Sequence, residues 1–136
     1  MVTAVDSSVL LDVVTDDPQW ADGSEAALRK ASSEGSLIIG ECVLAEITPA
    51  LGAEVVEEFL DDWDIRFVAS SRASAILAGR LFAVQLARGG KGGRVVADFL
   101  IGAHAQLHAE RLLARDRGYL RDYFRKLTVW QPATNS

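Results

Sequence analysis

The sequence predicts an α/β fold with a central parallel sheet flanked by helices. Short apolar runs of strand type alternate along the chain with longer segments of helical periodicity. The runs are mostly apolar, as in strands that a parallel sheet buries on both faces. The chain has 136 residues, of which 49% are hydrophobic but only 7% aromatic, which suits one core of helices packed on such a sheet.

Five short apolar runs are expected to form the strands. They are Thr3–Val5, Leu37–Ile39, Ile65–Val68, Leu112–Ala114 and Leu127–Trp130. Two helical segments separate each of the first three strands from the next, and one short helical segment separates the fourth strand from the fifth. This alternation predicts the crossover connections that parallel strands require.

The segments between the strands are expected to be helical. They are Val9–Thr15, Gln19–Ser33, Glu41–Ile47, a segment reaching Asp62, Arg72 to about Arg88, Val95–Ala109 and Tyr119–Phe124. Ser7 or Ser8 is expected to cap the first of these helices, and Pro18 suits the first turn of the second. Thr48 and Pro49 are expected to end one helix and start another.

The chain is expected to form one domain over residues 1–132, followed by a frayed tail over 133–136. The single cysteine, the lack of a secretion signal and the lack of a membrane-length apolar run favour a cytoplasmic protein without a membrane partner. A net charge of −5 argues against a simple electrostatic nucleic-acid binder. It leaves open an acidic metal site that acts on nucleic acid, because bound cations offset carboxylates.

Four acids stand out by their positions. Asp6 and Asp116 follow the first and fourth expected strands, and Glu46 and Asp98 lie in otherwise apolar helices. Each alone has an ordinary explanation as a helix cap, a turn residue, a partner of a helix dipole or a solvated side chain. Four together favour a shared site, because ligands bind outside the carboxyl ends of parallel strands. Oxygen ligands favour Mg²⁺ or Mn²⁺, for which phosphodiester hydrolysis is a natural reaction.

The acids also lie in recognisable motifs. The order Asp6-Ser7-Ser8, Ala45-Glu46-Ile47, Asp98–Ala105 and Leu112–Tyr119 resembles the PIN-domain nucleases, and within them the VapC-type toxins of toxin–antitoxin modules. The resemblance covers essentially the whole chain, and the order and spacing of the motifs make it more specific than any one motif. It implies a single PIN domain with a Rossmann-like sheet and a Mg²⁺- or Mn²⁺-dependent ribonuclease site.

The resemblance also implies roles and partners. Asp6, Asp98 and Asp116 would hold the metal directly, Glu46 would bind a second metal or position water, and the Ser7 hydroxyl would support Asp6. The implied partners are an RNA substrate, a VapB-type antitoxin whose C-terminal segment fills the acidic groove, and a second copy of the toxin. One departure is Ala114, which stands where the family often has Thr or Ser.

Basic residues flank the glycine-rich stretch before Asp98. Arg88, Lys91 and Arg94 could steer an RNA backbone towards the acids, although a solvated loop is the simpler interpretation. The stretch lacks the spacing of a phosphate-binding P-loop. Asp122 could be an auxiliary acid but is better explained as a solvated turn residue.

His104 and His108 are spaced as zinc ligands could be on a helix, but the sequence offers no third ligand, so packing or surface roles are favoured. Cys42 is interpreted as a small core residue rather than a nucleophile.

Two functions compete with the ribonuclease. A phospho-acceptor receiver domain is also doubly wound and binds Mg²⁺, but it needs paired acids after the first strand and an acceptor aspartate after the third. Here Asp6 is followed by serines, and Ala69-Ser70 follows the third strand. The other alternative is a PIN-like domain kept as a non-catalytic binding module, against which the presence of all four acids argues.

Overall fold

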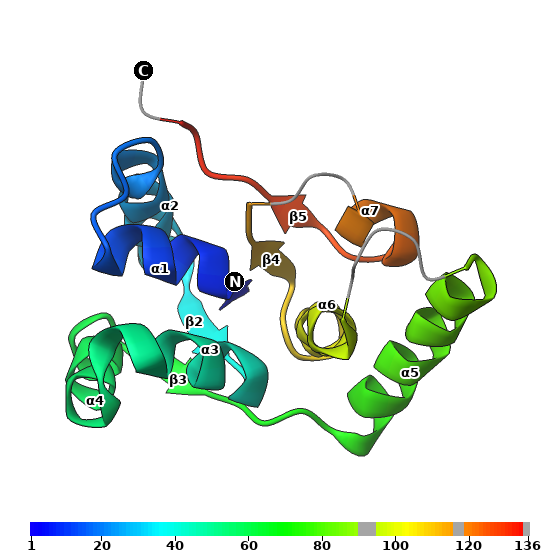
Figure 1. The fold of residues 1–136 in the computed structure, drawn as a ribbon. Helices are drawn as coiled ribbons and strands as arrows, with labels where there is room; N and C mark the ends of the chain where they lie inside the picture. The colour runs from blue at the N-terminus through cyan, green and yellow to red at the C-terminus, as the bar shows by residue number, and fades with distance from the viewer. Residues whose placement is uncertain (90–94, 116–118, 135–136) are drawn as a thin grey trace.

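The computed structural model describes residues 1–89, 95–115 and 119–134, and these form an α/β fold (Figure 1). Five parallel strands build the sheet in the order β3-β2-β1-β4-β5. The strands are β1 (Val2–Val5), β2 (Ser36–Ile39), β3 (Ile65–Phe67), β4 (Arg111–Leu113) and β5 (Val129–Trp130). The predicted parallel sheet is confirmed, with β1 at its centre.

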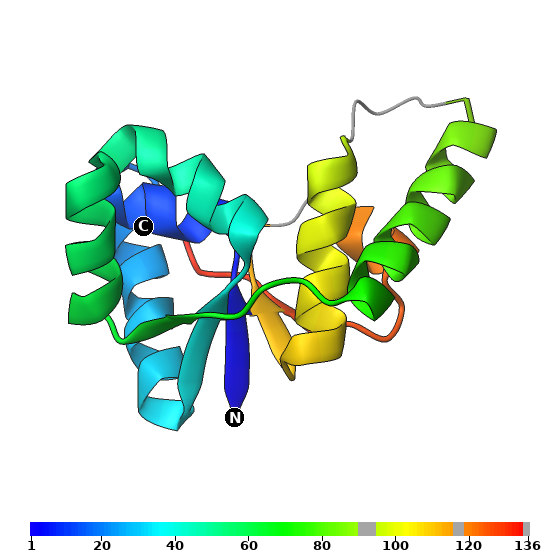
Figure 2. The same cartoon turned by 90° about the horizontal axis from the view of Figure 1, so that it is seen from below.

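Helices cover both faces of this sheet. They are α1 (Ser7–Val14), α2 (Ala21–Glu34), α3 (Glu41–Leu51), α4 (Ala53–Asp62), α5 (Arg72–Ala87), α6 (Val96–His108) and α7 (Tyr119–Tyr123). Figure 1 shows α1 and α2 on one side of the strands and α6, with α5 outside it, on the other. Helix α3 contacts both α1 and α6 and lies at the end towards which β1 points (Figure 2).

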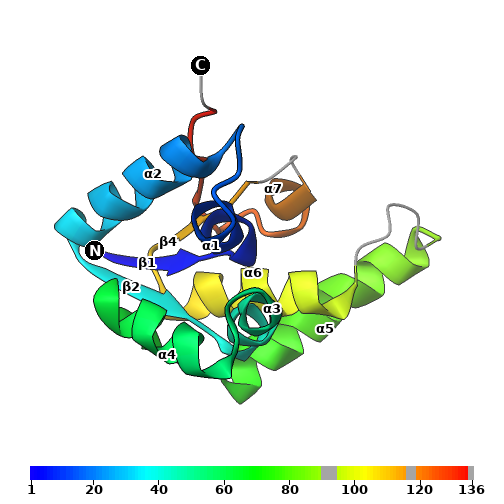
Figure 3. The ribbon, with the colours of Figure 1, turned by 60° about the vertical axis from the view of Figure 1, so that its left-hand side comes forward.

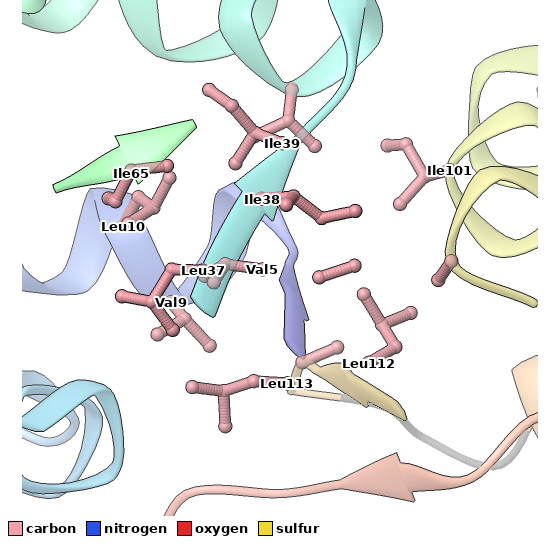
Figure 4. Packing of buried hydrophobic residues seen from close by; sticks show 14 of the residues in the cluster. Val5, Val9, Leu10, Leu37, Ile38, Ile39, Ile65, Ile101, Leu112 and Leu113 are labelled. Carbon is pink, nitrogen blue, oxygen red and sulfur yellow. The ribbon is translucent and has the colours of Figure 1, made fainter. Parts of the chain in front are cut away.

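The core lies between the central strands and the two helix layers. Val5, Leu37 and Leu112 are almost fully buried on neighbouring strands. Leu10 of α1 and Ile101 of α6 approach the sheet from opposite sides (Figure 4). Burial on both faces explains why the central strands β1 and β2 carry mostly apolar side chains.

Strand order separates two doubly wound folds. Receiver domains share the flavodoxin-like order 2-1-3-4-5, whereas β2 lies between β3 and β1 here. The observed order is that of the first five strands of the Rossmann arrangement. The receiver-domain alternative is therefore excluded by topology.

The predicted break at Thr48-Pro49 is wrong. Helix α3 continues through Pro49 to Leu51 and ends at Gly52, whose φ of +89° favours glycine. The Thr48 hydroxyl donates to the Leu44 carbonyl (2.6 Å), and the Gly52 N–H donates to the Thr48 carbonyl (2.7 Å). Proline near the end of a helix costs one hydrogen bond, and little helix remains after it to be broken.

The C-terminal residues run from β5 back along α2 (Figure 3). Ala133 lies against Gly23, where even a methyl group would collide with its carbonyl. Among the helices within the described ranges, none is long and apolar enough to cross a membrane.

Candidate metal centre

Asp6 lies at the carboxyl end of the central strand. Its backbone N–H donates to the Leu113 carbonyl (2.9 Å), so the β1–β4 ladder continues one residue beyond β1. The two strands that precede Asp6 and Asp116 are therefore neighbours, as the shared-site interpretation requires. Asp116 itself lies outside the described residues, two positions beyond the buried Ala114.

The Asp6 carboxylate caps α1. Its Oδ2 accepts hydrogen bonds from the Ser8 N–H (3.2 Å) and from the Ser8 hydroxyl (2.6 Å). The helix begins at Ser7, so the prediction that Ser7 or Ser8 is the cap was wrong by one or two residues. Asp6 supplies the same acceptor chemistry from the preceding position.

Glu46 reaches the same region from α3. Its Oε1 accepts a hydrogen bond from the Ser7 hydroxyl (3.2 Å), which joins α3 to the start of α1. The Ser7 hydroxyl thus donates to Glu46 and not to Asp6. The hydroxyl that donates to Asp6 is that of Ser8.

Asp98 occupies the third position of α6. Its Oδ2 accepts a hydrogen bond from the Val95 N–H (3.1 Å), so it satisfies a free backbone donor at the helix start. The side chain is half-buried and faces a helix end whose dipole favours negative charge.

Burial and neighbouring negative charge shift the pKa values of Asp6 and Glu46. Burial raises the pKa of Asp6; hydrogen bonds from Ser8 oppose this effect, and the charge of Asp98 adds to it. Burial also raises the pKa of Glu46, followed by the charge of Asp6. None of the ion pairs within the described ranges involves these three acids. Like charges gathered without a cationic partner form a site that a bound cation would stabilise.

The donor chemistry fits Mg²⁺ or Mn²⁺, because all three groups offer carboxylate oxygens. The ligand set is incomplete as described. Across residues 1–89, 95–115 and 119–134, no three His, Cys, Asp or Glu side chains come close enough to hold one ion. The predicted fourth ligand, Asp116, lies outside these residues.

Comparisons with known proteins place the fold. No family model and no curated protein matches the sequence. Among solved structures, VapBC2 from Rickettsia felis bound to a promoter DNA fragment has a chain that matches with TM-score 0.73 and 18% identity over 97% of this chain and 99% of that one. DNA-bound VapBC from Salmonella typhimurium gives 0.71 and 14% over 96% and 98%. A toxin–antitoxin complex from Klebsiella pneumoniae gives 0.61 and 16% over 93% and 95%.

The chain has the PIN-domain fold. The match spans nearly all of both chains, so the resemblance of the ordered motifs is accompanied by a likeness of the whole architecture.

The predicted basic contacts are only partly described. Arg88 is exposed at the end of α5, and its guanidinium lies over the Tyr123 ring at 5.4 Å from the centroid. Lys91 and Arg94 lie outside the described residues. Asp122 is exposed on α7.

Both histidines lie within hydrogen-bonding distance of other residues of the fold. His104 Nε2 lies 2.6 Å from the Val68 carbonyl and His108 Nε2 lies 3.2 Å from the Ser71 hydroxyl. Burial lowers the pKa of His104 and raises that of the Cys42 thiol, which disfavours a reactive thiolate.

Sequence reasoning missed a network beside Asp6. The Ser8 hydroxyl, which donates to Asp6, lies 3.2 Å from the Arg115 N–H and accepts from it. The Arg115 side chain donates to both oxygens of buried Asp12 (2.9 Å each) and stacks over Trp20. Asp12, like Glu46 and Asp98, is an acid within an otherwise apolar helix, and this feature could have identified it from the sequence. This network fixes the backbone of β4 to the residues that hold Asp6.

Proposed function

We propose that this chain is a Mg²⁺- or Mn²⁺-dependent endoribonuclease that acts as the toxin of a toxin–antitoxin module. One observation carries the proposal. Asp6, Glu46 and Asp98 converge at the carboxyl end of the central strand, and the pKa values of Asp6 and Glu46 are raised, mainly by burial. Carboxylates with perturbed pKa values that gather at one place are typical of a functional site. The motif order and the likeness to chains of VapBC complexes support the assignment.

Each acid has a separate task in the proposed reaction. Asp6, Asp98 and Asp116 would hold the metal, and Glu46 would act on a second metal or on the attacking water. A bound divalent cation would stabilise negative charge on the phosphodiester and make water more acidic. Ser8 holds the Asp6 carboxylate in one orientation, and Ser7 does the same for Glu46. A raised pKa brings Glu46 closer to the pH at which a general base works best.

The proposed partner is a VapB-type antitoxin whose C-terminal segment fills the acidic groove. An unneutralised carboxylate cluster attracts basic side chains, so the same charge that would bind the metal would bind an inhibitor. A toxin homodimer and a toxin–antitoxin hetero-oligomer complete the proposed assembly. The similar structures include VapBC complexes and a toxin–antitoxin complex.

Cleavage of RNA by the purified chain tests the activity. We expect Mg²⁺ or Mn²⁺ to support cleavage, EDTA to stop it, and Asp98→Asn to reduce the rate at least 100-fold with the fold intact by circular dichroism. Asp62→Asn is the matched control, because it removes the same charge from an exposed position on α4. It should cleave as the wild type does. Full activity of Asp98→Asn would overturn the assignment.

The non-catalytic alternative makes a different prediction. A binding module would bind RNA but leave it intact with every divalent cation. Induction in cells separates the two cases. Wild-type protein should create new RNA 5′ ends and slow growth, whereas Asp98→Asn should do neither.

A further inference from the structure

Charge is divided unevenly along the chain. Residues 1–79 contain 4 Lys or Arg and 15 Asp or Glu, a net charge of −11. Residues 80–136 contain 10 Lys or Arg and 4 Asp or Glu, a net charge of +6. The overall charge of −5 conceals this division. A polyanion would therefore be attracted by unpaired cations of the second stretch and repelled by the acids of the first.

The fold brings part of the basic half next to the candidate metal centre. Helix α7 packs on α6 through aromatic rings, with the Tyr123 centroid 5.2 Å and the Phe124 centroid 6.3 Å from that of Phe99. Phe124 also lies over Gly102, where a Cβ would come within 2.5 Å of its ring. Asp98 precedes Phe99 directly and lies one helical turn before Gly102. Tyr123 of α7 and the following Phe124 thus pack against α6 within about one turn of Asp98 along that helix.

Four exposed cations lie on α7 or on the segments beside it. Arg88 reaches over the Tyr123 ring from α5, Arg121 lies on α7, and Arg125 and Lys126 follow Phe124 in the segment that leads to β5. We call these four residues the basic ledge. Arg88, Arg125 and Lys126 take part in no ion pair with any side chain that the structure describes. Their charge is therefore available to an anionic ligand.

We propose that the basic ledge binds the phosphate backbone of single-stranded RNA and directs it into the acidic centre. This inference rests on the proposed function for its choice of ligand. A nuclease with a carboxylate site must bind a polyanion that its own site repels, so cationic contacts have to lie beside the acids rather than among them. Arg88 and α7 approach α6 through Tyr123 and Phe99, whereas α3, which belongs to the acidic half, contacts α6 separately. A strand held by phosphate contacts would consequently enter from the α7 side.

Binding of a fluorescent 20-nucleotide RNA of mixed sequence tests the ledge. Anisotropy is measured in EDTA, so that no cleavage occurs, at several KCl concentrations. The test variant is Arg125→Gln with Lys126→Gln. The matched control is Arg66→Gln with Arg72→Gln, which removes two exposed arginines from the acidic half. Thermal unfolding of each variant checks the fold.

We expect the ledge variant to weaken binding about 25-fold at 0.1 M salt and to reduce the slope of log Kd against log salt by about 1.4, because each phosphate contact on a single strand contributes about 0.7. The control should stay within about twofold of the wild type. Equal effects of the two double variants, or an unchanged slope, would overturn the ledge. Tighter binding of duplex DNA than of RNA would overturn the choice of ligand.

Failure of this proposal is distinct from failure of the nuclease assignment. RNA binding is measured without a metal and does not depend on catalysis. Normal RNA cleavage by the ledge variant would overturn only the proposed role of the ledge. Expected salt slopes in a protein that never cleaves RNA would overturn only the nuclease assignment.

Discussion

Opposing effects act on the ionisation of the Asp6 carboxylate. Hydrogen bonds from Ser8 favour the charged form that caps α1, whereas burial and the nearby charge of Asp98 disfavour it. Burial is the largest effect, so the pKa lies above its ordinary value of 3.8. A carboxyl group whose pKa is raised in the folded state stabilises the fold fully below the ordinary value, and this stabilisation is lost as pH rises through the raised value.

Asp6→Asn should therefore raise the free energy of unfolding at pH 7 in EDTA. Asparagine keeps an oxygen acceptor for the cap but cannot ionise, so the cost of the buried charge disappears. The gain over wild type should shrink as pH falls through the raised value, and it should disappear well below 3.8, where Asp6 is protonated in both states. Urea unfolding at a series of pH values measures this difference. A variant that is less stable than wild type at pH 7 would contradict the proposed cost of the buried charge.

Magnesium provides an internal control for the same pair of proteins. Added MgCl₂ should raise the unfolding free energy of the wild type and have a smaller effect on Asp6→Asn, because a ligand that binds only the folded state stabilises it. Equal stabilisation of both proteins would place the bound ion elsewhere.

At the scale of elements, one glycine sets how closely α6 and α7 pack. A Cβ at Gly102 would lie 2.5 Å from the Phe124 ring, which is itself buried and cannot swing aside. We expect Gly102→Ala to cost about 1–3 kcal/mol, the usual cost of overpacking a core. Gly79→Ala is the matched control, since nothing lies within 4 Å of its Cβ in the middle of α5. That change should stabilise the protein by about 0.5–1 kcal/mol.

Chemical denaturation of both alanine variants measures the two free energies. A combined Gly102→Ala, Phe124→Leu variant should recover part of the loss if the collision is its cause. Similar effects at the two glycines would show that helix propensity, rather than packing between α6 and α7, dominates at Gly102.

Most elements were predictable because their signals are local. Apolar runs such as Leu37–Ile39 mark strands, and Ser71 marks the start of α5, where it caps the helix with Ser74. The error at Thr48-Pro49 has a physical reason. A local rule treats proline as a break, whereas the turn that ends α3 depends on the positive φ available to Gly52.

At the scale of the whole molecule, the sequence could predict that Asp6 and Glu46 lie in one region, but not all of their contacts. The parallel alternation predicts that Asp6 lies at the carboxyl end of its strand, and the pairing of β1 with β4 then follows the expected fold. The sequence could not show that Ser8, instead of the expected Ser7, donates a hydrogen bond to Asp6. Which hydroxyl reaches which carboxylate depends on how α3 packs against α1, a contact between segments 39 residues apart.

The same limit applies to Asp12 and Arg115, which lie 103 positions apart and link the two ends of the chain. Asp12 is 2% exposed and also accepts a hydrogen bond from Ser24, while the Arg115 side chain is 33% exposed. The pair ties α1 and α2 to the end of β4. The Arg115 backbone N–H donates to the Ser8 hydroxyl, which in turn donates to Asp6.

We expect Arg115→Met to destabilise the fold by about 3 kcal/mol, because it leaves the Asp12 carboxylate buried without its cation. Asp12→Leu should cost less, since the guanidinium that it leaves unpaired reaches solvent. The double variant should be more stable than Arg115→Met alone, with a coupling energy of about 1–3 kcal/mol from urea unfolding. Strict additivity of the two changes would show that the ion pair does not join the helices to β4. If the pair does join them, the single Arg115 variant should also lose RNA cleavage in proportion to its disturbance of Ser8, whereas Arg29→Met, which removes an exposed ion pair on α2, should leave cleavage unchanged.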